Sequence, residues 1–124
     1  MQFTFSYGIF SSEKFIEKNP EVIIKFLNHH KKASNLLRNS PLLAAKKIAK
    51  SFEIVSEEYV NSVLEISPKY CIALSEGFIS STMEFASSLY RLAYIKRNLT
   101  LEDIFNLEFV NKVHPEKDHF RYQN

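Results

Sequence analysis

This chain has very few of the residues that build covalent cross-links, tight turns and phosphate-binding loops. It has one cysteine, Cys71, two glycines and no tryptophan among its 124 residues. A single cysteine excludes an internal disulfide and every metal site that needs several cysteines. With so few glycines there is little room for a glycine-rich loop that cradles phosphate groups. We therefore predict neither a disulfide scaffold nor a site of that kind.

The chain also lacks a long hydrophobic run and a strong excess of charge. No apolar run approaches the roughly 20 residues that a membrane-spanning helix needs, and no basic segment followed by an apolar one marks a signal peptide. The net charge of +2 is too small to predict nucleic-acid binding by itself. We expect no membrane span and no nucleic-acid partner, and the sequence leaves the localisation of the chain open.

What the chain does have is a content of hydrophobic residues, 45%, that is ordinary for a soluble globular protein. At this length it forms one domain at most. Apolar spacing after residue 10 predicts a mainly α protein, and proline or serine marks most of the helix starts. The predicted helices cover residues 11–19, 20–39, 41–52, 56–66, 75–96 and 100–113, and residues 114–124 are predicted to be a polar tail.

Residues 2–10, QFTFSYGIF, are the exception, because aromatic and small polar side chains alternate in the period-two pattern of a β-strand. A lone strand leaves its backbone N–H and C=O groups unpaired, and almost no second strand can be found downstream. We expect either that this strand pairs with another copy of the chain or that the rest of its sheet lies elsewhere. A disordered N-terminal segment is the alternative.

The helix predicted over residues 20–39 organises the remaining elements. Asn19 suits an N-cap, and Pro20 suits the first helical position. We expect the other elements to pack against an apolar stripe on one face of this helix, with polar side chains on the opposite face. The stripe comprises Val22, Ile23, Phe26, Leu27, Ala33, Leu36 and Leu37, and the opposite face carries Lys25, Asn28, Lys31, Lys32, Asn35 and Arg38.

No group of residues predicts catalysis or metal binding. Adjacent helical residues point about 100° apart, so His29 and His30 cannot readily chelate one metal ion; we expect His30 to be packed and His29 to lie at the margin of the stripe. Cys71 has no basic neighbour in sequence and is predicted to be inert packing. His114 and His119 fall in a segment expected to be mobile. We predict no catalytic residue, no metal, no cofactor and no enzymatic activity.

Acidic pairs have a simpler explanation than acid–base catalysis. Glu57 and Glu58, like Glu102 and Asp103, lie in the first turns of predicted helices, where the helix dipole favours carboxylates. Thr100 and Asp103 have the spacing of a capping box in which aspartate replaces the usual glutamate. We therefore predict that these carboxylates stabilise helix starts.

Several short motifs occur in an order and at spacings that resemble a known family. They are Ser12-Glu13-Lys14-Phe15, Asn19-Pro20-Glu21, Phe26-Leu27, the helix pair from Asn39 to Ala49, Ser67-Pro68-Lys69-Tyr70, Leu74-Ser75, the run from Leu89 to Lys96, and the stretch from Thr100 to Phe109. Over about residues 3–113 this set resembles the C-terminal part of periplasmic-binding-protein-like solute receptors. The branch in question serves ABC importers of nitrate, sulfonates, taurine and thiamine pyrimidine precursors.

The resemblance implies a two-lobed α/β fold with the ligand held between the lobes. This chain would be a mainly helical fragment of that fold, with one N-terminal strand that crosses between the lobes. Thr4, Ser6 and Tyr7 are the only polar side chains positioned to face the cleft, and ordinary strand packing is their alternative role. The implied function is non-covalent capture of a small organic or oxyanionic solute by a periplasmic or extracellular parent that delivers it to an ABC permease. The chain alone is not expected to bind the ligand.

A second hypothesis is a self-contained helical interaction or ligand-sensing module of a signalling protein. Such a module would fold alone, with the N-terminal strand unattached. The receptor hypothesis instead predicts exposed apolar surface where the missing sheet would lie. A homo-oligomer formed through the N-terminal strand would be one way to cover that surface.

Overall fold

The computed structural model describes residues 8–67 and 70–116, and these residues form helices without any strand. The prediction of a mainly α protein is therefore confirmed. The predicted helix over residues 20–39 is observed with those bounds as α2. The described helices are α1 (Glu13–Lys18), α2 (Pro20–Asn39), α3 (Pro41–Ser51), α4 (Glu57–Ile66), α5 (Glu76–Arg91), α6 (Leu101–Ile104) and α7 (Glu108–Val113).

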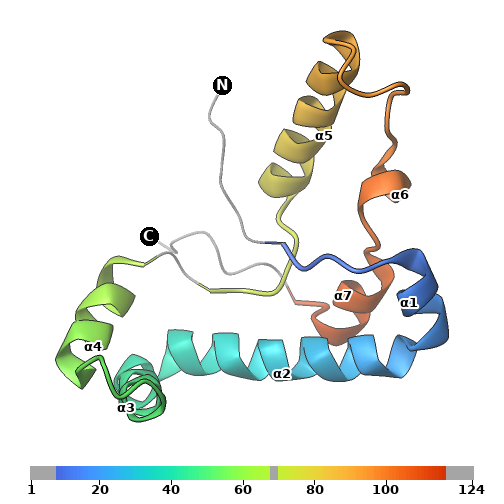
Figure 1. The fold of residues 1–124 in the computed structure, drawn as a ribbon. Coiled ribbons are helices and arrows are strands. Elements are labelled where there is room, and N and C mark those ends of the chain that lie inside the picture. Colours follow the sequence, from blue (N-terminus) through green and yellow to red (C-terminus); the bar gives the residue numbers. More distant parts are fainter. Residues whose placement is uncertain (1–7, 68–69, 117–124) are drawn as a thin grey trace.

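The helices are arranged as two limbs that meet at a corner (Figure 1). The lower limb is α2, with α3 and α4 at its C-terminal end and α1 at its N-terminal end. The upper limb consists of α5 and α6, which rise away from α2. Helix α7 packs on α2 where the limbs meet. The extended stretch 70–74 passes over α2 on its way from the α4 side of the molecule to α5.

Serine caps explain where three of the helices begin. The hydroxyl oxygens of Ser12, Ser56 and Ser75 each accept a hydrogen bond from a backbone N–H in the first turn of α1, α4 and α5. Such caps satisfy N–H groups that have no partner inside the helix. The helices α2 and α3 begin instead with Pro20 and Pro41, as the sequence predicts.

Helix α5 ends five residues earlier than predicted, at Arg91 rather than at residue 96. Ala93 has a φ of 60°, in the left-handed region. The N–H of Ala93 donates to the carbonyl of Tyr90 and the N–H of Tyr94 donates to that of Leu89, which is the Schellman pattern. Glycine normally occupies this position, and an alanine there costs roughly 1 kcal/mol. The sequence carries no glycine near residue 93 to mark this end.

The helix predicted over residues 100–113 is two short helices. Helix α6 stops after one turn because Phe105 adopts an extended backbone, and α7 begins only at Glu108. The ring of Phe105 packs edge-to-face on Phe78 of α5, with ring centroids 5.9 Å apart. This contact links the end of α6 to α5 in the upper limb. It is made by Phe105, which lies in the non-helical segment between α6 and α7.

The predicted N-terminal strand over residues 2–10 falls mostly outside the described residues. Its described part, residues 8–10, is not in a strand, and Phe10 is 91% exposed. Pairing of this segment with a second copy of the chain stays a prediction.

The apolar core of the described residues is small and is built from small side chains. Ala44 and Ala45 of α3 are almost fully buried, and Val60 of α4 is buried as well. Alanine lets the two helices approach closely, because it adds only a methyl group to the helix surface. Val110 and Val113 of α7 are the buried apolar residues at the corner. The best-packed part of the structure is thus the α3–α4 hairpin.

Helix α2 packs with a face that matches the predicted one only in part. The side turned toward α7 and the stretch 70–74 carries Leu27, Lys31, Ser34 and Arg38, a spacing of three or four residues that defines one helix face. Ser34 is buried, whereas Phe26 of the predicted stripe is exposed. The predicted packing against the apolar stripe therefore holds only in part, because Leu27 of the stripe lies on this face while Phe26 does not. Two basic side chains, Lys31 and Arg38, share the face with it.

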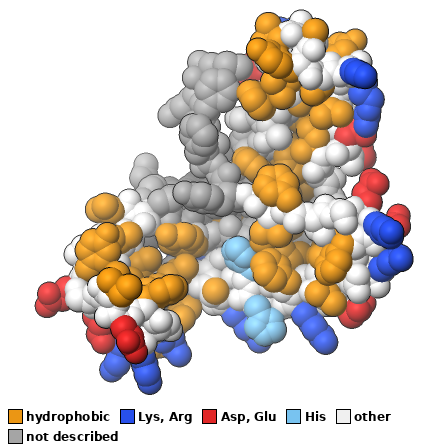
Figure 2. All heavy atoms as spheres, viewed as in Figure 1, with side chains coloured by type: hydrophobic (Ala, Val, Ile, Leu, Met, Phe, Trp, Pro, Cys, Tyr) orange, Lys and Arg blue, Asp and Glu red, His pale blue; other side chains and the backbone are white. Residues whose placement is uncertain are grey.

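The protein exposes much more surface than a compact monomer of its size. Its accessible surface is 10152 Å², whereas a compact 14.5 kDa protein exposes about 6,900 Å². Large hydrophobic side chains are exposed on both limbs (Figure 2). They include Val22 and Phe26 on α2, Leu42, Phe52, Ile54, Tyr59 and Ile66 on or near the hairpin, and Phe85, Tyr90, Leu92 and Tyr94 on the upper limb.

Candidate functional site

The densest group of polar and titratable side chains lies at the corner, where three distant parts of the sequence meet. Lys31 comes from the middle of α2, Cys71 from the stretch 70–74, and His114 and Glu116 from the end of α7 and beyond. We call these four residues the corner cluster. The contacts of Lys31 with Glu116 and of Cys71 with His114 join residues that are more than 40 positions apart in sequence. A local sequence pattern therefore could not predict the cluster.

Lys31 holds the cluster to α2. Its Nζ donates to the carbonyl oxygen of Val113 at 2.9 Å and to Oε1 and Oε2 of Glu116 at 2.8 and 3.0 Å. The carbonyl of Val113 is one of the last acceptors of α7, which have no partner within the helix. A single ammonium group therefore stabilises the end of one helix and fixes the carboxylate that follows it.

Glu116 connects Lys31 to His114. Its Oε2 lies 2.6 Å from Nδ1 of His114, and the contact is an ion pair when the imidazole is protonated. Hydrogen bonding from Lys31 is the largest cause that lowers the pKa of Glu116 from 4.5 to about 2, followed by hydrogen bonding from the Glu116 backbone. At pH values well above this pKa the Glu116 carboxylate is ionised and can interact with both Lys31 and His114.

His114 is the buried centre of the cluster. The residue is 5% exposed, and its Nε2 lies 3.2 Å from Sγ of Cys71. The backbone N–H of Ala73 also donates to this sulfur, at 3.5 Å. The prediction that the chain is mobile from His114 onward is wrong for His114 itself. The sequence shows only a histidine before a proline, which is why its burial could not be predicted.

The corner cluster has the order of groups found in nucleophilic enzymes, a thiol next to an imidazole that faces a carboxylate. Such chemistry also needs donors that stabilise an oxyanion and a concave space for the substrate. Among the described residues, no three histidine, cysteine, aspartate or glutamate side chains are placed to hold a metal ion. The contacts of the cluster support a structural role at the corner.

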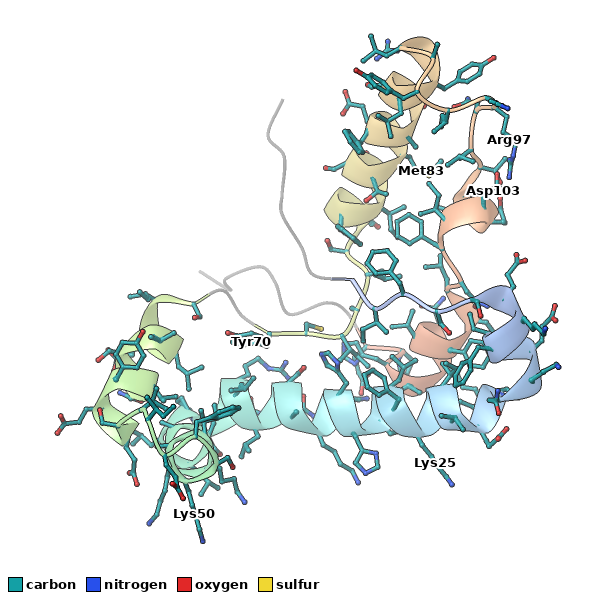
Figure 3. The ribbon with its side chains drawn as sticks, in the orientation of Figure 1. Lys25, Lys50, Tyr70, Met83, Arg97 and Asp103 are labelled. Atoms are coloured by element: carbon teal, nitrogen blue, oxygen red, sulfur yellow. The ribbon has the colours of Figure 1, made fainter. Side chains whose placement is uncertain are left out.

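Arg38 adds a second polar link between α2 and the stretch 70–74. Its Nη1 donates to the carbonyl oxygen of Tyr70 at 2.9 Å, and its Nη2 donates to Oδ1 of Asn35 at 2.7 Å. Figure 3 shows Tyr70 beside α2, on the side opposite to Lys25. Lys31 and Arg38, seven residues apart, therefore attach two turns of α2 to the segments that lead into the upper limb.

The acidic pair at the start of α6 acts as predicted. Asp103 and Thr100 form a capping box, and Arg97 donates two hydrogen bonds of 2.6 Å to the Asp103 carboxylate (Figure 3). The Arg97 guanidinium and the Thr100 backbone N–H hold the pKa of Asp103 well below its usual range. Arg97 thus closes the connection between α5 and α6, a contact that the sequence does not predict.

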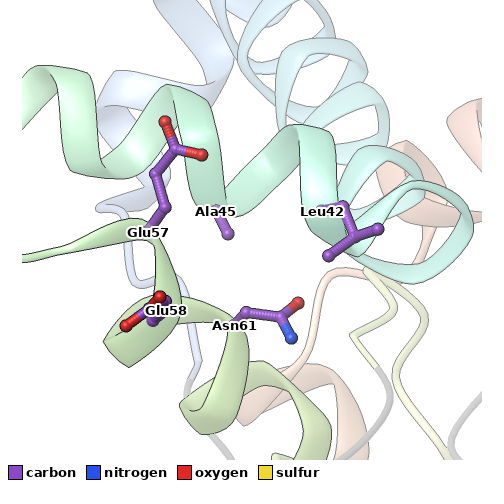
Figure 4. Close-up of a pocket in the computed structure, with 5 residues that line it drawn as sticks. All are labelled: Leu42, Ala45, Glu57, Glu58 and Asn61. Carbon is purple, nitrogen blue, oxygen red and sulfur yellow. The ribbon is translucent and has the colours of Figure 1, made fainter.

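The other acidic pair, Glu57 and Glu58, lies in the first turn of α4 and also borders a groove between α3 and α4 (Figure 4). The groove has a volume of about 230 Å³. Leu42 and Ala45 of α3 form its apolar side, and Asn61 completes the side formed by α4. We call these five residues the hairpin groove. Sequence reasoning accounts for the two carboxylates as helix-start residues but not for their placement beside an exposed leucine.

The remaining candidate residues are not brought into one site. Thr4, Ser6 and Tyr7, predicted to face a ligand cleft, lie outside the described residues. His29 and His30 are both exposed, so the prediction of a packed His30 is wrong. The rings of His30 and Phe26 pack edge-to-face, with centroids 6.1 Å apart.

Comparison with models of protein families, with curated proteins and with solved structures finds no match for this chain. Across the part of the chain that the structure describes, none of the helices combines the length and apolar character needed to cross a membrane.

Proposed function

We propose that this chain is the C-terminal part of the substrate-binding component of an ABC importer. In the parent protein it would help to capture a small organic or oxyanionic solute without covalent chemistry and to deliver it to the permease. The proposal rests on the motifs between residues 3 and 113, which resemble solute receptors of this kind. The chain alone would not be competent to bind the solute.

The observation that supports incompleteness best is the imbalance between core and surface. The buried apolar residues among those described are alanine and valine, while Phe26, Leu42 and Tyr94 are 50%, 72% and 77% exposed. Burying apolar area is the main favourable term in folding, worth about 25 cal/mol per Å². A chain that leaves so many large side chains in water has the surface expected of one part of a larger α/β lobe.

In this proposal the N-terminal residues contribute to the solute site. Thr4, Ser6 and Tyr7 would be the polar side chains on the strand that crosses between the lobes. The described helices would then form the outer layer of one lobe, and their exposed apolar side chains would pack on its sheet. The parent family is periplasmic or extracellular, and the proposal carries the same expectation for the parent of this chain.

The alternative is a self-contained helical interaction or ligand-sensing module. It is favoured by the corner cluster, which links α2, α7 and the stretch 70–74 through contacts between distant residues. A module held together in this way would unfold cooperatively without any further lobe. It would also tolerate removal of residues 1–10.

Ligand-dependent melting separates the two hypotheses. The purified chain is heated with a panel of sulfonates, nitrate and pyrimidines, because a ligand that binds only the folded state raises the melting temperature. The receptor hypothesis predicts no shift for the chain alone, together with binding of an apolar dye. A concentration-dependent shift favours the sensing module. A strict monomer that binds no dye contradicts the receptor hypothesis.

Limited proteolysis provides a second discriminating observation. If residues 1–10 are removed without loss of melting cooperativity, the N-terminal segment is not part of the folded unit and the module is favoured. If trimming broadens or lowers the transition, the segment contributes to the fold, as the receptor hypothesis requires.

A further inference from the structure

Helix α2 carries a second face whose side chains are exposed. Val22, Phe26, His29 and Ala33 recur every three or four residues on the side away from α7, and we call them the outer stripe. Val22 is 43% and Phe26 is 50% exposed. Lys25 and Lys32 are exposed on one border of the stripe. The result is an apolar helix face with a positively charged edge.

The hairpin groove has the complementary character. Leu42, 72% exposed, offers an apolar contact, and the carboxylates of Glu57 and Glu58 lie on the opposite side of the opening (Figure 4). The groove is open to solvent, and its volume of about 230 Å³ exceeds the roughly 150 Å³ of an enclosed apolar cavity that holds a benzene ring, so by volume it has room for one phenyl ring. The groove therefore fits an aromatic residue that is flanked by basic residues.

We propose that the outer stripe of α2 in one copy of this chain docks in the hairpin groove of a second copy, with Phe26 as the anchor. The charges match, because Lys25 and Lys32 would face Glu57 and Glu58. The proposal uses only exposed faces of this chain. It concerns the chain by itself, because in the parent receptor Phe26 and Leu42 would instead pack on the sheet.

The contact has to be intermolecular. Phe26 and the end of α2 at Asn39 are separated by roughly 20 Å along a continuous helix, at 1.5 Å per residue. The stripe around Phe26 therefore cannot fold back into the groove of its own hairpin, which begins at Pro41. Because the two surfaces differ, each copy offers both a stripe and a groove, and association grows with protein concentration.

The α3 lysines do not remove this complementarity. Lys46, Lys47 and Lys50 are exposed on α3 but do not line the groove, and Lys50 points away from the hairpin in Figure 3. The polar side chains that line the groove are the two glutamates and Asn61. The lining of the groove itself therefore contains two carboxylates and no lysine.

Sedimentation velocity over a range of protein concentrations tests the proposal. We expect the sedimentation coefficient of the wild type to rise with concentration at low salt, and the rise to shrink at high salt because exposed ion pairs are screened. Two charge reversals, Lys25→Glu with Lys32→Glu and Glu57→Lys with Glu58→Lys, should each weaken association at least about tenfold. An equimolar mixture of the two reversed proteins should associate again.

A matched control changes charge without touching either surface. Glu17→Lys with Glu84→Lys alters the net charge as much as the groove reversal, at exposed positions of α1 and α5, and should leave association unchanged. Leu42→Asp provides a groove variant that does not alter the first turn of α4, and it should also weaken association. Circular dichroism verifies that each variant keeps its helix content.

Three outcomes overturn the proposal. One is a wild type that remains monomeric at every concentration in low salt. Another is a mixture of the two reversed proteins that stays monomeric although each reversal abolished self-association. The third is association that survives both reversals and is lost only when residues 1–10 are removed, which would support pairing through the N-terminal segment instead.

Discussion

The α3–α4 hairpin and the corner cluster hold this protein together by different means. The hairpin joins neighbours in sequence through Ala44, Ala45 and Val60, with no charge between the helices' buried surfaces. The corner joins α2 to residues far along the chain through Lys31 and His114. Apolar packing between close neighbours depends little on salt or pH, whereas a polar corner depends on both. The corner, where the two limbs meet, is therefore the region whose stability depends more on salt and pH.

The largest effect is expected from removing the buried ring of the corner cluster. His114→Ala leaves a cavity and removes the contacts to Cys71 and Glu116, so we expect a loss of about 3 kcal/mol in the free energy of unfolding. Urea titration followed by circular dichroism measures it. The exposed His29→Ala serves as the control and should change stability by less than about 0.5 kcal/mol. Equal effects of the two substitutions would show that the corner does not contribute to stability.

The hairpin should be most sensitive to added volume. Ala45→Leu places three extra carbon atoms in a contact where alanine is 2% exposed, and we expect it to lose about 2 kcal/mol of stability. Ala33→Leu, at an exposed position of α2, is the matched control. At low protein concentration it should change the free energy of unfolding very little. Raising the salt concentration should leave the Ala45→Leu effect unchanged. A salt-dependent loss would mean that the hairpin also relies on charge.

The same contrast explains which parts of the fold could be predicted from the sequence. The start of α4 after Ser56 follows from side-chain capping within one helical turn. The start of α2 follows from the suitability of Pro20 for the first helical position, while the side chain of Asn19 makes no capping hydrogen bond. Local rules also account for the capping box of Thr100 and Asp103. These features depend on neighbours in sequence, and the structure confirms them.

What could not be predicted depends on distant residues or on an unusual backbone. The apolar stripe of α2 is clear in the sequence, yet the face with Lys31 and Arg38 contacts α7 and the stretch 70–74, because the acceptors for these cations come from Tyr70, Val113 and Glu116. The left-handed Ala93 that ends α5 has no sequence signal at all. Of the candidate sites, the helix-start role of Glu57 could be predicted, while the hairpin groove and the burial of His114 required the structure.

A smaller effect is expected at the second polar link of the corner. Arg38→Met keeps much of the aliphatic stem but removes the hydrogen bonds to the carbonyl of Tyr70 and to Asn35, so we expect a loss of about 1 kcal/mol. Lys32→Met, an exposed basic residue of the same helix, is the control. The difference between the two variants in urea midpoint measures the link. If the two midpoints coincide, α2 is held at the corner by Lys31 and apolar packing without Arg38.

The smallest effect, a pH dependence, tests whether Lys31 and Glu116 act as a pair. In the folded protein the pKa of Glu116 is about 2, compared with 4.5 ordinarily. The unfolded chain therefore takes up a proton first as the pH falls, and the stability contributed by this carboxylate is fully present above about pH 4.5 and is lost toward pH 2. Lys31→Met removes the largest cause of the lowered pKa.

We therefore expect the gap in urea midpoint between the wild type and Lys31→Met to be largest near pH 7 and to narrow at pH 3. Lys25→Met, an exposed lysine on the other side of α2, controls for the general effect of losing a positive charge as other carboxylates titrate. Its gap to the wild type should not show the same narrowing. A Lys31→Met gap that is the same at both pH values would mean that Lys31 stabilises the corner through the Val113 carbonyl alone, because that acceptor does not titrate.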